Sequence, residues 1–385
     1  MAYSVSPLRG ASVKGPVIIG GGPAGSAASI ELARAGHQVT LIERTVTATD
    51  KVCGDFLSPE AVARIEALGV DLADAPAIDT LRLIHRRRVV QTRLPFTARA
   101  LSRRALDEAL LQQATAAGAS VLRGHRVSTV DGCGAALQVV SGALGRIATD
   151  TVFLATGKHE LRGDARRAHH NRLVGLKMYY QLERSQLLAL RGHIELMLLR
   201  GGYAGLQLIE RDRAVLCMLL PAACLPAAAG CWAVLIGSLA QDCPHLADRL
   251  SGAKALLDRP LAIANLPYGY VYRAPRGHRN GLYRLGDQAA VIPSFTGDGV
   301  ALALASGSLA ARMWLNADSS DTYQRRFAQD VSAQMRSAVA IHRLVLTQLW
   351  RPWLVTICGI WPGLMSFVAQ QTRFAALTDS GYALH

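Results

Sequence analysis

The sequence has little that would support a metal centre, a disulfide framework or nucleic-acid recognition. Its seven cysteines are scattered without a C-x-x-C pair, which argues against a zinc site or disulfide framework and indicates a reducing compartment. Only 6% of the residues are aromatic, and no nucleic-acid motif accompanies the basic segments 85–88 and 165–167. The first residues lack the apolar core of a signal peptide. We therefore expect a cytoplasmic protein that binds neither a metal nor nucleic acid.

Internal repeats and low-complexity tracts are also missing. The 385 residues are 50% hydrophobic, which suffices for two or three domain-sized units with a large core. The formal net charge is +14. A solvated basic surface explains this charge, but an acidic substrate, a carrier protein or an anionic membrane surface is compatible with it as well.

What the sequence does contain near its start is a glycine-rich turn between two apolar segments. Each apolar segment is rich in β-branched residues, as buried parallel strands are, and a helical pattern lies between them. The predicted strand, helix and second strand cover residues 17–19, 24–35 and 39–42. This order is that of a complete βαβ unit.

The glycines of this unit follow the spacing G-x-G-x-x-G, and an acidic residue ends its second strand. Gly20 permits the tight turn, Gly22 lets the backbone approach a pyrophosphate, and Gly25 lets the helix pack closely on the strand. The helix N-terminus presents N–H groups and a partial positive charge to that anion. Glu43 is placed to accept hydrogen bonds from ribose hydroxyls. The unit predicts a bound dinucleotide, either NAD or FAD.

Three later blocks discriminate between these two cofactors. They are "ALSRRALDEALLQQATAAGASVLRG" (100–124), which starts with a serine at a helix N-cap position, "DTVFLATGK" (150–158) and "GLYRLGDQAAVIPSFTGDGVALALASGSLAARMW" (281–314). With the first unit, their order resembles the FAD-dependent oxidoreductases of the para-hydroxybenzoate hydroxylase fold, particularly the geranylgeranyl-reductase-like branch. "KVCGDFLSPEA" (51–61) is also similar to that branch, and the resemblance covers most of residues 15–315.

The resemblance implies an α/β fold, in which a Rossmann-type FAD-binding domain carries an inserted antiparallel-sheet substrate domain and a C-terminal helical segment. The FAD-binding domain is expected to be discontinuous. The expected boundaries are 15–75, 98–170 and 280–330 for the FAD-binding domain, 76–97 and 171–279 for the substrate domain, and 331–385 for the C-terminal helices.

The resemblance also implies residues that contact FAD. They are Gly20, Gly22, Pro23, Ala24 and Gly25 at the pyrophosphate, Glu43 and Arg44 at the adenosine ribose, Val127 at adenine, Asp287 at ribityl or pyrophosphate oxygens, Gly297, Asp298 and Gly299 at the flavin N1–O2 edge, and Arg103 and Gly157 elsewhere along the cofactor. Reduced flavin carries negative charge at its N1–O2 edge, which the dipole of a helix N-terminus stabilises.

The candidates for catalysis lie where the chain is expected to cross from the FAD strand toward the flavin ring. Lys51 could stabilise an anionic flavin or substrate, and Cys53 could lie in the pocket, although a phosphate-binding lysine and a packing cysteine fit equally. Lys177 and Tyr179 share one face of a predicted substrate-domain strand, where they line a pocket or simply pack. Tyr203 is a third substrate candidate.

The segment around Tyr203 departs from the family. Geranylgeranyl reductases carry a motif resembling Y-x-W-x-F-P, whereas this chain has "YAGLQL" (203–208), with Gly205 in place of tryptophan. The W-x-W-x-I-P signature of flavin-dependent halogenases is not found. The departure weakens a prenyl-reductase assignment, and Gly205 leaves room above the flavin for a bulkier ring.

These observations predict an FAD-dependent monooxygenase of a small apolar or aromatic secondary metabolite. The alternatives are a flavin-dependent reductase of an isoprenoid-like alkene, a non-redox FAD-dependent cyclase, and a flavoprotein that acts on a protein partner. No second dinucleotide motif is visible, so NAD(P)H would bind transiently, or a separate flavin reductase would deliver the electrons.

The C-terminal stretch 352–372 has no charged residue and lies near Trp350, Trp353 and Trp361. A packed helical hairpin, an interfacial anchor that makes peripheral membrane contact, and a membrane span are all compatible with this pattern.

Overall fold

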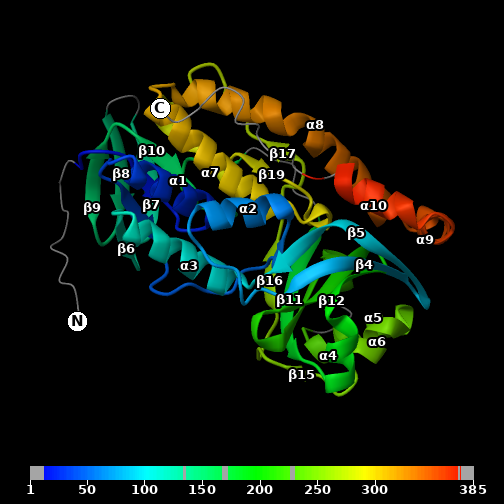
Figure 1. Cartoon of the computed structure of the whole chain (residues 1–385). Coiled ribbons are helices and arrows are strands. Elements are labelled where there is room, and N and C mark those ends of the chain that lie inside the picture. Colours follow the sequence, from blue (N-terminus) through cyan, green and yellow to red (C-terminus); the bar gives the residue numbers. More distant parts are fainter. Residues whose placement is uncertain (1–12, 133–135, 167–171, 226–229, 372, 374–385) are drawn as a thin grey trace.

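A computed structural model describes residues 13–132, 136–166, 172–225, 230–371 and 373. Figure 1 shows two sheets, with long helices above the first and shorter helices below the second. The expected α/β fold, with a Rossmann-type region, an antiparallel sheet region and C-terminal helices, is confirmed.

The first sheet is parallel and draws its five strands from distant parts of the chain. Their order is β18 (Leu282–Arg284), β10 (Val152–Leu154), β1 (Val17–Ile19), β2 (Thr40–Glu43) and β6 (Ser120–Arg123). The helices α1 (Pro23–Arg34), α3 (Arg103–Ala116) and α7 (Gly299–Leu315) cover one face. The three-stranded sheet β7 (Val127–Asp131), β8 (Leu137–Ser141) and β9 (Gly145–Thr149) covers the other.

Burial on both faces explains why these strands are continuously apolar. In β1, Ile18 packs into the cluster formed with the helices, whereas Val17 and Ile19 pack against the three-stranded sheet. Side chains of a strand alternate between the two faces, so both faces need apolar residues here. Ser102 caps α3 by accepting a hydrogen bond from Ala105 N, as its position predicts.

The second sheet has nine strands. Eight lie in the order β15 (Lys254–Ala255), β11 (Leu173–Gln181), β14 (Arg213–Pro221), β13 (Gly202–Ile209), β12 (Gly192–Leu199), β4 (Ala77–His85), β5 (Arg88–Ala100) and β3 (Phe56–Leu57), and β16 (Leu261–Ala264) pairs with β11. Only β12 and β4 are parallel neighbours. The helices α4 (Arg184–Leu190), α5 (Trp232–Asp242) and α6 (Pro244–Leu250) pack on one face.

Residues 193–221 differ from the predicted strand, turn and strand, because they form parts of three strands, β12, β13 and β14. The additional turn lies at the polar residues 210–212, where Arg211 has a positive φ of 60°. The remaining short elements are α2 (Pro59–Ala67), β17 (Tyr270–Val271) and β19 (Ala290–Val291).

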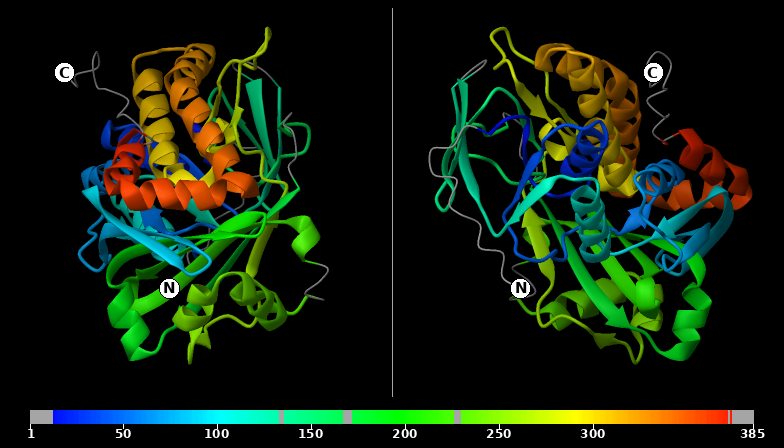
Figure 2. Two further views of the ribbon diagram at one scale, coloured as in Figure 1. Left: turned by 90° about the vertical axis from the view of Figure 1, so that its right-hand side faces the viewer. Right: turned by 60° about the vertical axis from the view of Figure 1, so that its left-hand side comes forward.

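The chain ends in three helices, α8 (Ser320–Leu346), α9 (Arg351–Ile360) and α10 (Pro362–Gln371). Helix α8 runs unbroken across residue 330, so the expected boundary there does not coincide with an element boundary. Helices α9 and α10 lie beside the β4–β5 hairpin (Figure 2). Within the described residues, no single helix is long and apolar enough to cross a membrane.

Candidate active site

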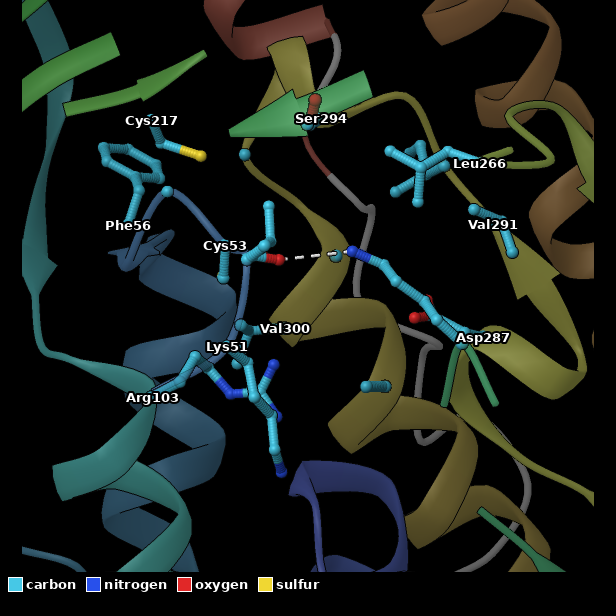
Figure 3. A pocket seen from close by; sticks show the side chains of 18 of the residues that line it. Lys51, Cys53, Phe56, Arg103, Cys217, Leu266, Asp287, Val291, Ser294 and Val300 are labelled. Carbon is cyan, nitrogen blue, oxygen red and sulfur yellow. Dashed lines mark hydrogen bonds between the residues drawn. The ribbon is translucent and has the colours of Figure 1, made fainter. Parts of the chain in front are cut away.

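A cavity of about 660 Å³ extends from the β1–α1 turn, past the second sheet, to the C-terminal helices. In Figure 3, Lys51 and Arg103 lie at one end of the view, and Phe56, Cys217, Ser294 and Leu266 surround the other. We call the end at the β1–α1 turn the cofactor half and the end at α8, α9 and α10 the substrate half. Residues from every part of the sequence meet around this one space.

The three motif glycines do different work in the cofactor half. A Cβ on Gly20, whose φ is 106°, would lie 2.4 Å from the Ala155 carbonyl oxygen, and one on Gly25 would lie 2.0 Å from the Gly20 carbonyl oxygen. Both glycines therefore permit close backbone packing. A Cβ on Gly22 would meet only Arg103 Nη2, at 3.5 Å. The backbone at Gly22 is bare on its cavity side, as a bound pyrophosphate requires.

Two helices begin at this cavity without a side-chain cap. Gly22 precedes α1 and cannot cap it, and Asp298 precedes α7 without making a cap hydrogen bond. Both starts line the cavity, at Gly22 and Gly299. The first N–H groups of each helix have no intrahelical partner and carry partial positive charge. Serine hydroxyls cap α2, α3 and α8, whereas α4, α5, α6 and α9 also begin without a side-chain cap, so α1 and α7 are set apart by starting at the cavity. Uncapped starts that converge on one cavity fit a diphosphate and the negatively charged edge of a reduced flavin.

Glu43 supports the turn as well as lining the cavity. Its carboxylate accepts hydrogen bonds from Gly21 N at 2.7 Å, Thr45 N at 3.0 Å and Thr45 Oγ1 at 2.8 Å. Burial alone would raise the pKa of Glu43, but these hydrogen bonds outweigh it and lower the pKa. The carboxylate is therefore ionised at neutral pH. The predicted adenosine contacts Arg44 and Val127 line the same end of the cavity.

Arg103 lies beside Gly22 and is held by a buried carboxylate. Its Nε and Nη2 donate to Asp107 at 2.9 and 3.0 Å, and Asp107 also accepts a hydrogen bond from Lys51 Nζ at 2.6 Å. Burial would lower the pKa of Arg103, but Asp107 outweighs burial and raises it. Two cations fixed on one carboxylate thus face the cofactor half, and both line the cavity.

The predicted substrate residues Lys177 and Tyr179 do not line the cavity. Lys177 is fully buried and pairs with Asp55 at 2.6 Å, and its Nζ also donates to the Lys51 carbonyl at 3.0 Å. Tyr179 donates to Asp50 and Asp55, each at 3.1 Å. The two side chains hold the segment that carries Lys51 in place from behind. Asp55 accepts hydrogen bonds from both side chains, so the arrangement depends on it. In the sequence, only its place within "KVCGDF" distinguishes this residue.

Asp298 also does not line the cavity. Its carboxylate is fully buried and forms an ion pair with Arg373 at 3.2 Å, across a long sequence separation. Burial raises the pKa of Asp298 to about 7, against the opposing charge of Arg373. Arg373 also lies over the rings of Phe56 and Phe96. No sequence pattern identifies Arg373.

Of the other predicted cofactor contacts, Pro23, Ala24, Gly157, Asp287 and Gly297 line the cavity and Gly25 does not.

A hydroxyl cluster, formed by Tyr203, Tyr268 and Ser294, lines the cavity near the start of α7. Ser294 Oγ accepts a hydrogen bond from Tyr268 at 2.9 Å and lies 2.7 Å from Tyr203 Oη. Burial raises the pKa of both tyrosines, so both stay protonated at neutral pH. His342 packs edge-on against them, and burial lowers its pKa to about 4. The sequence singled out only Tyr203.

Cys53 also lines the cavity, together with Cys217, which the sequence did not single out. Burial raises the pKa of the Cys217 thiol to about 12, so it is a neutral thiol at physiological pH.

The substrate half is walled by apolar side chains from three strands and three helices. They include Leu81, Leu83, Leu94 and Phe96 from β4 and β5, Ile194 and Leu196 from β12, Ile341, Leu344 and Val345 from α8, and Leu354, Cys358, Leu364, Met365 and Val368 from α9 and α10. The side chains in this list are uncharged, and the guanidinium of Arg373, which also lines the cavity, lies over Phe96. Such a lining suits an apolar molecule.

Comparisons with known proteins agree with this geometry. Residues 15–149 match the family model described as FAD binding domain. A menaquinone reductase of Mycolicibacterium smegmatis is 34% identical over 125 residues, and one of Mycobacterium tuberculosis is 36% identical over 121 residues. Each alignment covers 30% of this chain and 30% of the relative, so the chain matches under a third of the length of these proteins.

Solved structures match over nearly the whole chain at low identity. The flavin-dependent brominase Bmp2 has a TM-score of 0.77 at 18% identity, with 96% of each chain covered. A geranylgeranyl bacteriochlorophyll reductase-like protein from Thermoplasma acidophilum has a TM-score of 0.72 at 16% identity, covering 96% of this chain and 94% of that one. PqsL of Pseudomonas aeruginosa, in complex with 2-aminobenzoylacetate, has 0.69 at 18%, covering 87% and 96%. At these identities the likeness shows a shared fold.

The family match, the shared fold and the fit of the cofactor half confirm the resemblance inferred from the sequence. The chain therefore carries an FAD-binding domain at residues 15–149, has FAD as its cofactor and shares the fold of the para-hydroxybenzoate hydroxylase-like flavoproteins.

Proposed function

We propose that this oxidoreductase is a monooxygenase that hydroxylates an aromatic ring carrying a long apolar substituent. The observation that carries the proposal is the hydroxyl cluster, placed where the two halves of the cavity meet. Ser294 lies five positions before Gly299, the first residue of α7, while Tyr203 packs in the apolar cluster that also contains Val345 and Met365. The cavity therefore offers a cluster of hydroxyl groups with apolar walls beyond it.

The chain's own groups suit such a substrate. Ser294 can accept hydrogen bonds from both tyrosines, which leaves its own proton for a phenolic oxygen of the substrate. The apolar walls exclude water and hold the alkyl chain. When bound and reduced, FAD supplies the electrons for oxygen activation. The uncapped start of α7 then stabilises negative charge on the cofactor. NAD(P)H or a separate flavin reductase supplies two electrons, one oxygen atom enters the ring, and the other leaves as water.

A second candidate is reduction of an isoprenoid-like alkene. Relatives named menaquinone reductase favour a reductase, since they share 34–36% identity with part of this chain. An alkene with a long apolar tail would fit the same channel. This reaction consumes no oxygen, which separates it from hydroxylation.

The two reactions are distinguished by reoxidation of the enzyme. We would reduce the purified holoenzyme anaerobically, add a phenol with a long alkyl chain, and admit isotopically labelled oxygen. Hydroxylation predicts no reoxidation before oxygen enters and labelled product afterwards. Reoxidation without oxygen by a lipophilic alkene would establish the reductase instead, and product formation without net redox change would indicate a cyclase.

Two controls test the role assigned to the cavity. The same phenol without its alkyl chain should have a much higher KM, because it leaves the apolar walls empty. The variant Ser294→Ala should lose turnover of the long-chain phenol while keeping its FAD. Equal kinetics for both phenols would contradict the channel assignment.

A further inference from the structure

One face of the C-terminal helices is apolar and open to solvent. Seven of the thirteen exposed large hydrophobic side chains among the described residues lie between 349 and 367. This aromatic face consists of Leu349, Trp350, Trp353, Ile357, Ile360, Trp361 and Phe367. It includes three of the five tryptophans of the chain, with Trp353 64% and Trp361 71% exposed. Soluble monomers rarely leave such residues together at the surface, so the aromatic face marks a binding surface.

The opposite side of the same helices packs on the rest of the protein. Val355, Cys358 and Met365 are buried, and the latter two line the substrate half. The start of α9 is fixed by Arg351, whose buried guanidinium donates hydrogen bonds to the carbonyls of Leu199, Gly202 and Val345. Helix α9 therefore cannot turn its outer residues inward without emptying the cavity wall and breaking this anchor.

A positively charged rim adjoins the aromatic face. Arg86, Arg87 and Arg88 are exposed at the tip of the β4–β5 hairpin, and Arg88 Nη1 donates to Thr356 Oγ1 of α9 at 2.6 Å. Figure 2 shows the hairpin and the helix pair on the same side of the molecule. Residues 331–378 contain no aspartate or glutamate. Tryptophan beside clustered arginine is the combination that binds the interface of an anionic membrane.

From these contacts we propose that the protein docks peripherally on an anionic lipid surface through the aromatic face and the hairpin arginines. A bent pair, Gln348–Ile360 and Gly363–Gln370, has the length and composition of a span only when both parts are combined, and the two parts meet at 107°. With its inner side packed on the protein, the pair lies in the interface rather than crossing the bilayer. A symmetric dimer through this face would bring two arginine rims together, which like-charge repulsion opposes.

The test uses the purified holoenzyme and sedimentation with lipid vesicles. Vesicles of phosphatidylcholine alone are compared with vesicles that also contain phosphatidylglycerol. We expect binding to the anionic vesicles to be at least about tenfold tighter and to weaken with added salt. The variants Trp353→Ser/Trp361→Ser and Arg86→Gln/Arg87→Gln should each weaken binding by about tenfold or more. None of these four residues lines the cavity.

The matched control is Leu188→Ser/Val234→Ser, which removes two exposed apolar side chains from the helices below the second sheet. It should bind vesicles like the unchanged protein. FAD content and thermal stability establish that every variant is folded. The proposal is overturned if the protein ignores both kinds of vesicle, if it binds them equally, or if the tryptophan variant binds normally. It is also overturned if light scattering shows a dimer that the tryptophan variant dissociates while no vesicle binding occurs.

Discussion

The two halves of the cavity are built on different principles. In the cofactor half, bare backbone at Gly22 and two uncapped helix starts face the space, backed by Arg103 and Glu43. In the substrate half, side chains from distant strands and helices form an apolar wall with one hydroxyl cluster at its inner end. The first half recognises charge by fixed dipoles, and the second recognises shape and apolarity. Changes in each half should therefore affect different measurements.

The largest difference between the two halves is expected from the variant Gly22→Val. The valine side chain would fill space in which a Cβ at this position meets only the Arg103 guanidinium within 4 Å, and so would exclude the diphosphate. We expect FAD affinity to fall by about 100-fold or more, since backbone approach to the phosphate is lost. Flavin fluorescence on titration of the apoprotein measures this, with circular dichroism as the control for folding. Unchanged affinity would remove the basis of the cofactor half.

Replacing Arg103 by glutamine should have the next largest effect. The substitution removes a charged donor beside Gly22 and leaves Lys51 alone on Asp107. Hydrogen bonds to charged groups contribute about 1.5–3 kcal/mol, so FAD should bind about 10- to 100-fold more weakly. The same titration measures it, and Arg104→Gln, on an exposed neighbour, is the matched control. If both variants bind FAD alike, Arg103 does not contact the cofactor.

The ion pair between the start of α7 and the residue after the C-terminal helices is tested by the variant Asp298→Asn. Asp298 precedes α7, and its partner Arg373 follows the C-terminal helices. The pKa of Asp298 is about 7 in the folded protein and near 3.9 in an unfolded chain, so the folded state holds this proton more tightly. Its contribution to the free energy of unfolding therefore falls as the pH rises from about 4 to 7. The asparagine variant should lose that dependence, a difference of about 3 kcal/mol.

Urea unfolding of the two apoproteins across this pH range gives the measurement. The relevant quantity is the change in their stability difference with pH, because the other acidic groups titrate in both. If the stabilities of the two proteins change in parallel with pH, the pKa of the Asp298 carboxyl is not raised in the folded state.

The smallest effect is expected from Gly205→Val, the counterpart of Gly22→Val in the substrate half. A Cβ on Gly205 would be 3.7 Å from Leu196, an ordinary contact, so the valine should be tolerated while narrowing the cavity. We expect FAD affinity to stay within about twofold and the KM of a long-chain substrate to rise several-fold, about 1 kcal/mol. A loss of FAD comparable to that of the Gly22 variant would break the distinction between the halves.

The amino-acid sequence alone was enough to predict the fold class, the FAD cofactor, the tight turn at Gly20 and the close packing at Gly25. The glycine positions follow from backbone angles and close contacts within a short βαβ unit, which local residues dictate. The fold class and the choice of FAD over NAD depended on the resemblance carried by the later blocks. The positions of Lys177 and Tyr179 could not be predicted in the same way. Their shared strand face was evident, but the tertiary packing brought Asp55 against that face and separated it from the cavity.

Even less of the substrate half could be predicted from the sequence. The pairing of β17 with β19 brings Tyr268 close to Ser294, and Tyr203 joins them from β13 of the second sheet. Arg373 pairs with Asp298 although the two residues lie far apart in the sequence. The sequence of the C-terminal helices was compatible with a packed hairpin, an interfacial anchor or a membrane span, because their composition is apolar on all sides. The tertiary structure decided which side packs inward, since burial depends on neighbours far away in the chain and not on local periodicity.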